Sequence, residues 1–424
     1  MNIKKLCNGV RLCCHKTAQF KTSIVSLNII TPLDNNASKK ALLLHLLART
    51  NKDNPTLTAM NRKLASLYGA VIIPAVSKVG ESQVLTLSLS CIDDRFALDN
   101  ESVLTESVKL LLDCLFTPDI TLDGFKEENI EREKRLLCEK IDSLNDDKIR
   151  YAYKRMISEM CCDENYGISE LGEKDEINAV TAKELFTVWK QLLLFGNIQI
   201  NVTGNFNETL IEDEILHRFE ALERKKDDII QAHTEFLSES YDTKTVTEKQ
   251  KVQQSKLVIG MRAGMTYDMD NYAAIKVMTA IFGSGTFSKL FMNVREKLSL
   301  CYYCSARFIN SKGLIAVQSG VETENIDKAL EAIRHELDQV RAGNFTDDDI
   351  KAAKLSLKDS YSSVTDSVST IDSWCTMQCM SGDFLTPEDY INMIENVSRE
   401  EIIVAANMVT EDTVFILESE KEDE

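Results

Sequence analysis

Histidines with a nearby glutamate on one helix are the side chains from which many catalytic zinc sites are built. The chain has five histidines, His15, His45, His217, His233 and His335, and no two of them lie three or four residues apart. Only residues at those spacings share one face of a helix. A helical His-x-x-Glu-His zinc site is therefore absent, and His45, in an apolar segment, is better interpreted as a structural histidine.

The twelve cysteines offer no obvious zinc site either. Several of them, such as Cys91, Cys114 and Cys138, stand where an apolar residue would fit, which is typical of reduced thiols that pack as small hydrophobic side chains. The one Cys-x-x-Cys, Cys301–Cys304, lies in a segment that we predict to be a strand. Residues three apart on a strand face opposite sides, so we expect these two sulfurs to diverge. Cys375 and Cys379 share a helix face, but the sequence shows no third ligand for them.

Signatures of nucleophilic catalysis and of phosphate binding are missing as well. The sequence contains no Gly-x-Ser-x-Gly elbow and no Cys-Gly-Ser-Cys segment. The glycine cluster in Phe282–Phe287 lacks the Gly-Lys-Thr ending of a phosphate loop and lies between two predicted helices. We interpret it as a flexible connection or a peptide-contact loop. The residues alone therefore indicate no self-contained active site.

The composition limits the partners of the chain. It has 424 residues, and 49 basic against 67 acidic side chains give a net charge of −18. Such a field repels a phosphate backbone, which argues against nucleic acid as a partner. No segment approaches the roughly 18 consecutive apolar residues of a membrane span, and Met1–Gly9 is not followed by the apolar core of a secretory signal. We therefore expect a cytoplasmic protein without a membrane partner.

Two halves of the chain repeat one order of elements: a strand, two helices, two strands, several helices and a closing strand. Runs of strands followed by runs of helices are typical of α+β domains with a mainly antiparallel sheet. In the first half the predicted segments are 10–30, 39–49, 58–68, 70–77, 83–92, 102–116, 122–143 and 197–202. In the second half they are 256–262, 272–282, 287–297, 301–308, 313–319, 326–342, 347–362 and 413–417.

A charged and polar connection separates the halves. Residues 223–251 are rich in Lys, Asp, Glu, Thr and Gln and show no sustained apolar periodicity. Long polar connections are uncommon inside a compact domain and usually join domains. We therefore predict two similar α+β domains, 1–222 and 252–424, each a sheet covered by helices, with 223–251 as the linker.

Read together, these segments resemble the M16 (insulinase-like, pitrilysin-like) metallopeptidase family in its small, two-domain form of processing-peptidase type. The opening Leu6–Leu12 resembles the first strand of that family. The next helix of the family carries His-x-x-Glu-His, and the matching segment here is Ala-Leu-Leu-Leu-His. The resemblance thus implies that Ala41 replaces the first histidine, that Leu44 replaces the glutamate, and that His45 alone remains.

The third zinc ligand of the family is a glutamate on a later helix, which matches the segment Glu131–Ile141. Lys140 falls nearest that position, and Glu139 would point about 100° away around the helix. A catalytic zinc ion needs three protein ligands and an open position for water, and the general base of the family is the missing glutamate. We therefore expect no metal, no cofactor and no catalytic residue in this chain.

The second half keeps features of the family. Arg295 and Tyr302 match its Arg-(six residues)-Tyr element, which in active members binds the substrate backbone and helps to stabilise the oxyanion; a guanidinium and a phenol suit that task. An ordinary salt bridge for Arg295 and a packing role for Tyr302 are the alternative. Gly283, Ser284 and Gly285 fall where non-catalytic subunits of processing-peptidase type carry a glycine-rich substrate loop.

The resemblance implies a non-catalytic subunit that pairs with a homologous catalytic subunit, which brings His-x-x-Glu-His and zinc, to enclose a peptide substrate. The alternative is a peptide- or protein-binding scaffold that acts as a monomer or a homodimer. More narrowly, Lys134–Ile141, Asp146–Tyr153 and Ser288–Lys297 resemble a Firmicute subfamily that lacks the zinc motif and whose name links it to aminopentanol modification of elongation factor P. Those residues offer no direct support for that link.

Overall fold

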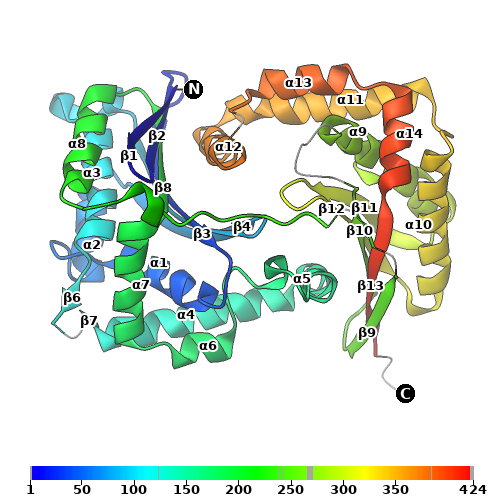
Figure 1. Cartoon of the computed structure of the whole chain (residues 1–424), viewed down its shortest axis with the longest axis horizontal. Coiled ribbons are helices and arrows are strands. Elements are labelled where there is room, and N and C mark those ends of the chain that lie inside the picture. The colour runs from blue at the N-terminus through cyan, green and yellow to red at the C-terminus, as the bar shows by residue number, and fades with distance from the viewer. Residues whose placement is uncertain are drawn as a thin grey trace. The chain divides into compact units, whose positions relative to one another are not determined.

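The computed structural model describes residues 2–122, 124–237, 239–240, 242–264, 271–382 and 384–420. The chain forms two compact units, and each combines three separate segments (Figure 1). The first unit contains Met1–Ile141, Ile168–His233 and Val364–Phe384. The second contains Asp142–Gly167, Thr234–Ser363 and Leu385–Glu424. Both units are α+β, as the order of elements predicted.

The first unit is built on a six-stranded sheet with the order β1-β2-β8-β3-β5-β4. Its neighbours pair antiparallel except β2 and β8, which are parallel. Strand β4 lies at an edge, the position where a strand tolerates Pro74. The strands are β1 (Asn2–Cys7), β2 (Val10–Lys16), β3 (Thr22–Pro32), β4 (Val71–Val79), β5 (Ser82–Ile92) and β8 (Asn197–Gly204).

Helices rich in leucine cover one face of this sheet (Figure 1). In α1 the five consecutive residues 40–44 are almost fully buried, as are Leu46 and Leu47, which agrees with the dense apolar pattern of this segment. The helices are α1 (Ala37–Arg49), α2 (Leu57–Ser66), α3 (Val103–Phe116), α4 (Glu127–Asp146), α6 (Lys174–Ala179), α7 (Ala182–Phe195) and α8 (Glu208–Glu220), with a small hairpin of β6 (Ile120–Thr121) and β7 (Gly124–Phe125).

The other face of the sheet is polar, and a helix from far along the chain covers it: α12 (Val368–Ser381). The Ser26 hydroxyl of β3 donates to the Asp372 carboxylate at 2.7 Å. The Asn201 amide of β8 donates to the backbone carbonyl of Asp372 at 3.2 Å. All three residues are buried, and buried polar groups need hydrogen-bond partners. Helix α12 therefore satisfies a polar face that would otherwise suggest contact with solvent.

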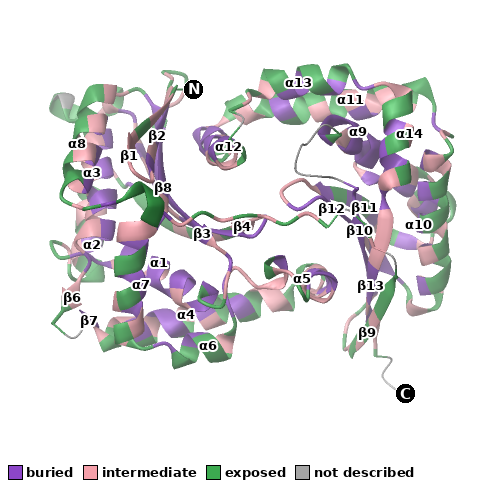
Figure 2. Ribbon diagram, in the orientation of Figure 1, coloured by how far each residue is buried: buried purple, intermediate pink, exposed green. Residues whose placement is uncertain are grey.

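The second unit has a five-stranded sheet with the order β11-β12-β10-β13-β9, in which only β13 and β9 are parallel. Helix α9 is buried nearly all round, whereas α10 exposes one face (Figure 2). In the described part of the chain, each helix is too short or too polar to traverse a lipid bilayer. The elements are β9 (Lys244–Gln250), β10 (Ser255–Arg262), β11 (Cys301–Ile309), β12 (Leu314–Val321), β13 (Thr410–Ser419), α9 (Tyr272–Gly283), a π-helix (Leu290–Lys297), α10 (Ile326–Arg341), α11 (Asp347–Ser362), α13 (Pro387–Glu395) and α14 (Arg399–Met408).

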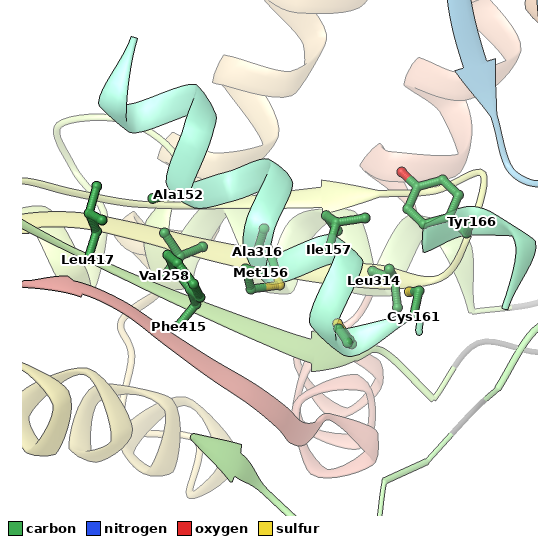
Figure 3. Packing of buried hydrophobic residues seen from close by; sticks show 11 residues of the cluster. Ala152, Met156, Ile157, Cys161, Tyr166, Val258, Leu314, Ala316, Phe415 and Leu417 are labelled. Atoms are coloured by element: carbon green, nitrogen blue, oxygen red, sulfur yellow. The ribbon is translucent and has the colours of Figure 1, made fainter. Parts of the chain in front are cut away.

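Helix α5 (Lys148–Met160) belongs to the second unit although it comes from the first half of the chain. Its apolar side chains Met156 and Ile157 lie on the sheet beside Val258 and Phe415, and all four are buried (Figure 3). Because α12 makes the reciprocal connection, each unit takes one helix from the opposite half. The units therefore depart from the linear division into 1–222 and 252–424, in which a helix stays with its neighbours in sequence.

The segment expected to be a linker, 223–251, contains a strand. Residues Lys244–Gln250 form β9, which pairs with β13 at the edge of the second sheet. All its side chains except Val246 are polar, and no residue of the strand is fully buried. Edge strands often carry charged side chains that discourage pairing with other chains, which explains why the polar sequence looked like a connection.

The buried carboxyl group of Asp372, on α12, makes the stability of the first unit depend on pH. Burial raises the pKa of Asp372 to about 6, although its hydrogen bonds with Ser26 and Asn201 act in the opposite direction. The folded state thus favours the protonated acid. Its contribution is fully present below about pH 4 and is lost as the pH rises through about 6, a difference of about 3 kcal/mol. Asp372→Asn keeps an acceptor for Ser26, so we expect it to stabilise the first unit by about 2 to 3 kcal/mol at about pH 8.

Both tryptophans, Trp189 and Trp374, lie in the first unit, so guanidinium unfolding followed by tryptophan fluorescence reports on it. The gain of Asp372→Asn should disappear at about pH 4, where the wild-type acid is protonated. Asp372→Ala is the control, because it removes both the charge and the acceptor and leaves Ser26 without its partner. A gain for Asp372→Asn that is equal at both pH values would contradict this account.

Candidate functional site

The residues that match the zinc motif lie on α1, and two of them belong to the hydrophobic core. Ala41 is 0% exposed and Leu44 is 1% exposed, so both pack against the interior of the first unit. His45 is half-buried, and its Nε2 atom is buried without a hydrogen-bond partner among the described residues. Hydrophobic packing therefore explains Ala41 and Leu44, whereas His45 keeps an unused polar atom.

A cavity of about 330 Å³ lies beside His45, between α1, α2, β4 and α4. Lys140 of α4 lines it together with His45. Glu139 does not line it and instead approaches Arg135 at 3.7 Å on the outer side of α4. The structure thus places Lys140 rather than Glu139 beside the cavity that His45 lines.

Two further charged residues in this cavity were not predicted. Arg49, one turn beyond His45, binds the buried Glu133 with Nε 2.8 Å from its carboxylate. Glu133 lies seven residues before Lys140, two turns along the same face of α4. Both spacings place side chains on a shared helix face, so this was the signal available in the sequence. Burial, with the positive charges of Lys140 and Arg49, lowers the pKa of His45 to about 4.

This set of side chains does not fit a zinc ion. Zinc takes deprotonated or neutral donors, with three protein ligands in a catalytic site. The cavity offers one imidazole, one carboxylate already engaged by a guanidinium, and an ammonium where a carboxylate ligand would be needed. Across the ranges that the structure describes, no three His, Cys, Asp or Glu side chains are placed to hold a metal ion. The site also lacks a glutamate base, because Leu44 occupies that position.

Arg295 and Tyr302 lie together in the second unit. Arg295 is on the π-helix, and its Nε donates to the backbone carbonyl of Tyr302 on the edge strand β11 at 2.9 Å. Its guanidinium also stacks on the Phe291 ring, 4.5 Å from the centroid. The Tyr302 side chain is 56% exposed and its hydroxyl donates to Glu322 at 2.8 Å. That carboxylate raises the pKa of Tyr302, so the phenol stays a proton donor at neutral pH.

The glycine-rich segment after α9 has a packing role. A Cβ on Gly283 would come within 2.5 Å of the Ala306 side chain, so the backbone can approach β11 only without one. The Ser284 hydroxyl donates to the Ala306 carbonyl at 2.8 Å. Gly285 has a φ of +98° and is exposed. Packing against β11 therefore accounts for the residue types at positions 283 and 284 without any substrate contact. Gly285 is the accessible residue of the segment.

The expectation that Cys301 and Cys304 diverge is wrong. Strand β11 has a bulge between Cys301 and Tyr303, where its register against β12 shifts. An extra residue in a strand reverses the alternation beyond it, so both cysteines are buried on one side. A hydrogen bond from Cys304 lowers the pKa of Cys301. Cys375 and Cys379 also gain a partner that the sequence did not reveal, because Cys13 of β2 packs with them.

Known proteins resemble the chain along its whole length. The model of the "Peptidase M16 inactive domain" family matches residues 179–357. The "Probable inactive metalloprotease YmfF" of Bacillus subtilis is 31% identical over 403 residues, which are 95% of this chain and 94% of that protein. The chain belongs to the M16 peptidase family. A conserved protein from Enterococcus faecalis V583 has a similar structure, with a TM-score of 0.89 at 28% identity over 100% of this chain and 99% of that one.

Other M16 structures share the fold at lower identity. A "peptidase M16 inactive domain" from Pseudomonas fluorescens aligns with a TM-score of 0.80 at 16% identity, over 100% of this chain and 99% of that one. The replaced motif and the kinship with YmfF agree with one another. The chain is an M16-type pseudo-peptidase.

Proposed function

We propose that the chain is the non-catalytic subunit of a heterodimeric M16 zinc peptidase. A homologous partner subunit supplies His-x-x-Glu-His, the third ligand and the zinc ion. This chain supplies Arg295 and Tyr302 to the site of the partner, and both subunits enclose the peptide substrate. The observation that carries the proposal is the 2.9 Å contact between Arg295 Nε and the Tyr302 backbone carbonyl, which links the guanidinium to the strand that carries the phenol.

Edge strands support the peptide-binding part of the proposal. Strand β4 ends the first sheet and β11, which carries Tyr302, ends the second. An extended peptide can add to such an edge through main-chain hydrogen bonds. The net charge of −18 favours a basic or neutral peptide over an acidic one. We place the complex in the cytoplasm.

Native mass spectrometry with metal analysis tests the proposal directly. The complex is captured from the source organism by a tag on this chain, under conditions that keep subunits together. We expect a partner of similar mass and one zinc ion per heterodimer. A metal-free monomer or homodimer would overturn the proposal and would favour the alternative, a peptide-binding scaffold with no peptidase activity. Capture of a tagged Arg295→Ala variant is the control for assembly, because the two donors face substrate and not the zinc ligands.

A further inference from the structure

The cavity beside His45 has the charge of an anion site. Its lining includes the cations Arg49 and Lys140 and a single anion, Glu133, in a chain that is strongly acidic as a whole. Glu133 is already bound by Arg49 at 2.8 Å and approached by Arg132 at 3.4 Å. Arg49 balances the charge of Glu133, so the charge of Lys140, which is exposed to solvent, gives the cavity lining a net positive charge. A local excess of positive charge attracts anions.

His45 supplies the second polar contact. His45 lines the cavity, and its Nε2 atom is buried and has no hydrogen-bond partner among the residues that the structure describes. A neutral imidazole carries a proton on one ring nitrogen and can donate it to an oxygen. A buried polar atom without a partner costs free energy unless a ligand satisfies it. Lys140 and His45 thus offer two donors, one charged and one neutral, at the same cavity.

Apart from Asn61 of α2, the rest of the lining is apolar. Leu57, Met60 and Leu64 of α2 face Leu137 of α4 and Ile72 of β4 around the cavity. A volume of about 330 Å³ lies at the small end of the range of ligand pockets. It suits one apolar side chain with its carboxylate better than a longer stretch of peptide.

The cavity adjoins the edge strand β4. Ile72 and Pro74 line it, whereas Val71 and Ile73 on the other side of the strand are each 51% exposed. An extended peptide can pair with this edge, but Pro74 has no N–H group to donate to it. Main-chain pairing with β4 is therefore interrupted at the cavity. A peptide that ends there gives up fewer main-chain hydrogen bonds than a peptide that continues past it.

We propose that this cavity binds the free C-terminal carboxylate of an extended peptide that ends in an apolar residue. The carboxylate contacts Lys140 Nζ and His45 Nε2, and the last side chain lies against the leucines of α2 and α4. An ammonium thus takes over the position of a zinc ligand and turns a metal site into a carboxylate site. The inference rests on the peptide-binding part of the proposed function, but it needs no partner subunit and concerns this chain alone.

Fluorescence anisotropy with the full chain tests the inference. The probe is a labelled hexapeptide that ends in Val-Leu, prepared once with a free carboxylate and once as the C-terminal amide. A charge-assisted hydrogen bond is lost in the amide, so we expect the free acid to bind at least about tenfold more tightly. Lys140→Gln should remove that difference, because it removes the charge and keeps a donor of similar length.

Two further variants and a second ligand sharpen the result. Lys351→Gln is the matched control, since this lysine is 77% exposed on α11 in the other unit, and it should bind like the wild type. Leu57→Asp places a carboxylate at the cavity on an exposed position in the first turn of α2, where an acid suits the helix dipole, and it should repel the free acid. Equal binding of acid and amide, or binding of decanoate as tight as that of the peptide acid, would overturn the inference. Neither outcome bears on the heterodimer, which mass spectrometry tests separately.

Discussion

Replacing Arg295 with alanine and Tyr302 with phenylalanine is expected to abolish peptide turnover by the complex without loosening its assembly. The Arg295 guanidinium donates to the backbone carbonyl of Tyr302, and the Tyr302 phenol is exposed and donates to Glu322. Donors aimed at a developing oxyanion typically contribute about 10²- to 10³-fold each to kcat. We therefore expect the double variant to lose at least about 10³-fold in kcat/KM, measured on a quenched fluorescent peptide.

The same strand provides matched controls for this experiment. Tyr303→Phe removes a hydroxyl from the neighbouring residue, and Arg307→Ala removes an exposed guanidinium further along β11. Both should leave kcat/KM within a few-fold of the wild type. Tyr302→Phe alone removes only an exposed hydroxyl that now contacts Glu322, so its folding should be unchanged. Full turnover by the double variant in an intact heterodimer would refute the role given to these residues.

The sequence was sufficient for the fold class because each half repeats an order of strands and helices with clear periodicity. It was insufficient for the assignment of α5 and α12. The periodicity of a helix such as Lys148–Met160 shows that one face is buried, but it does not show which sheet buries it. The polar side chains Ser26 and Asn201 bond to Asp372 of α12, which lies 346 and 171 positions further along the chain. Long-range partners of this kind leave no local signal.

The candidate site, like the fold, could be predicted only in part. The resemblance placed Ala41, Leu44, His45 and Lys140, and the structure brings His45 and Lys140 to one cavity. It could not show that the site would keep a cavity, because volume depends on how α2 and β4 pack beside α1. The bulge in β11 was hidden as well. One extra residue moves Cys304 to the same side as Cys301, and strand periodicity is too short-ranged to reveal such an insertion.

The exchange of α5 depends on a buried cluster of charges in the second unit. Glu164, which follows α5 in the chain, binds Arg262 of β10 at 2.7 Å and Lys312 at 2.6 Å. Arg262 also binds Asp412 of β13 at 2.9 Å. Burial opposes the ionised form of Glu164, but Arg262 and Lys312 outweigh it, and its pKa is lowered. The carboxylate therefore fastens the segment Asp142–Gly167 to the second sheet.

Glu164→Ala should destabilise the second unit by about 3 to 5 kcal/mol, because it removes the carboxylate that the buried cations Arg262 and Lys312 share. For a unit of this size that corresponds to a fall of roughly 10 °C in the midpoint of its transition in differential scanning calorimetry. Glu164→Gln keeps a side-chain oxygen that can accept hydrogen bonds from Arg262 and Lys312, so it should lose less stability than Glu164→Ala. Glu395→Ala makes the same chemical change at an exposed pair with Lys358 and is the matched control, with a midpoint close to that of the wild type. If Glu164→Ala melts like Glu395→Ala, the apolar face of α5, led by Met156 and Ile157, is by itself enough to hold the helix on the second sheet.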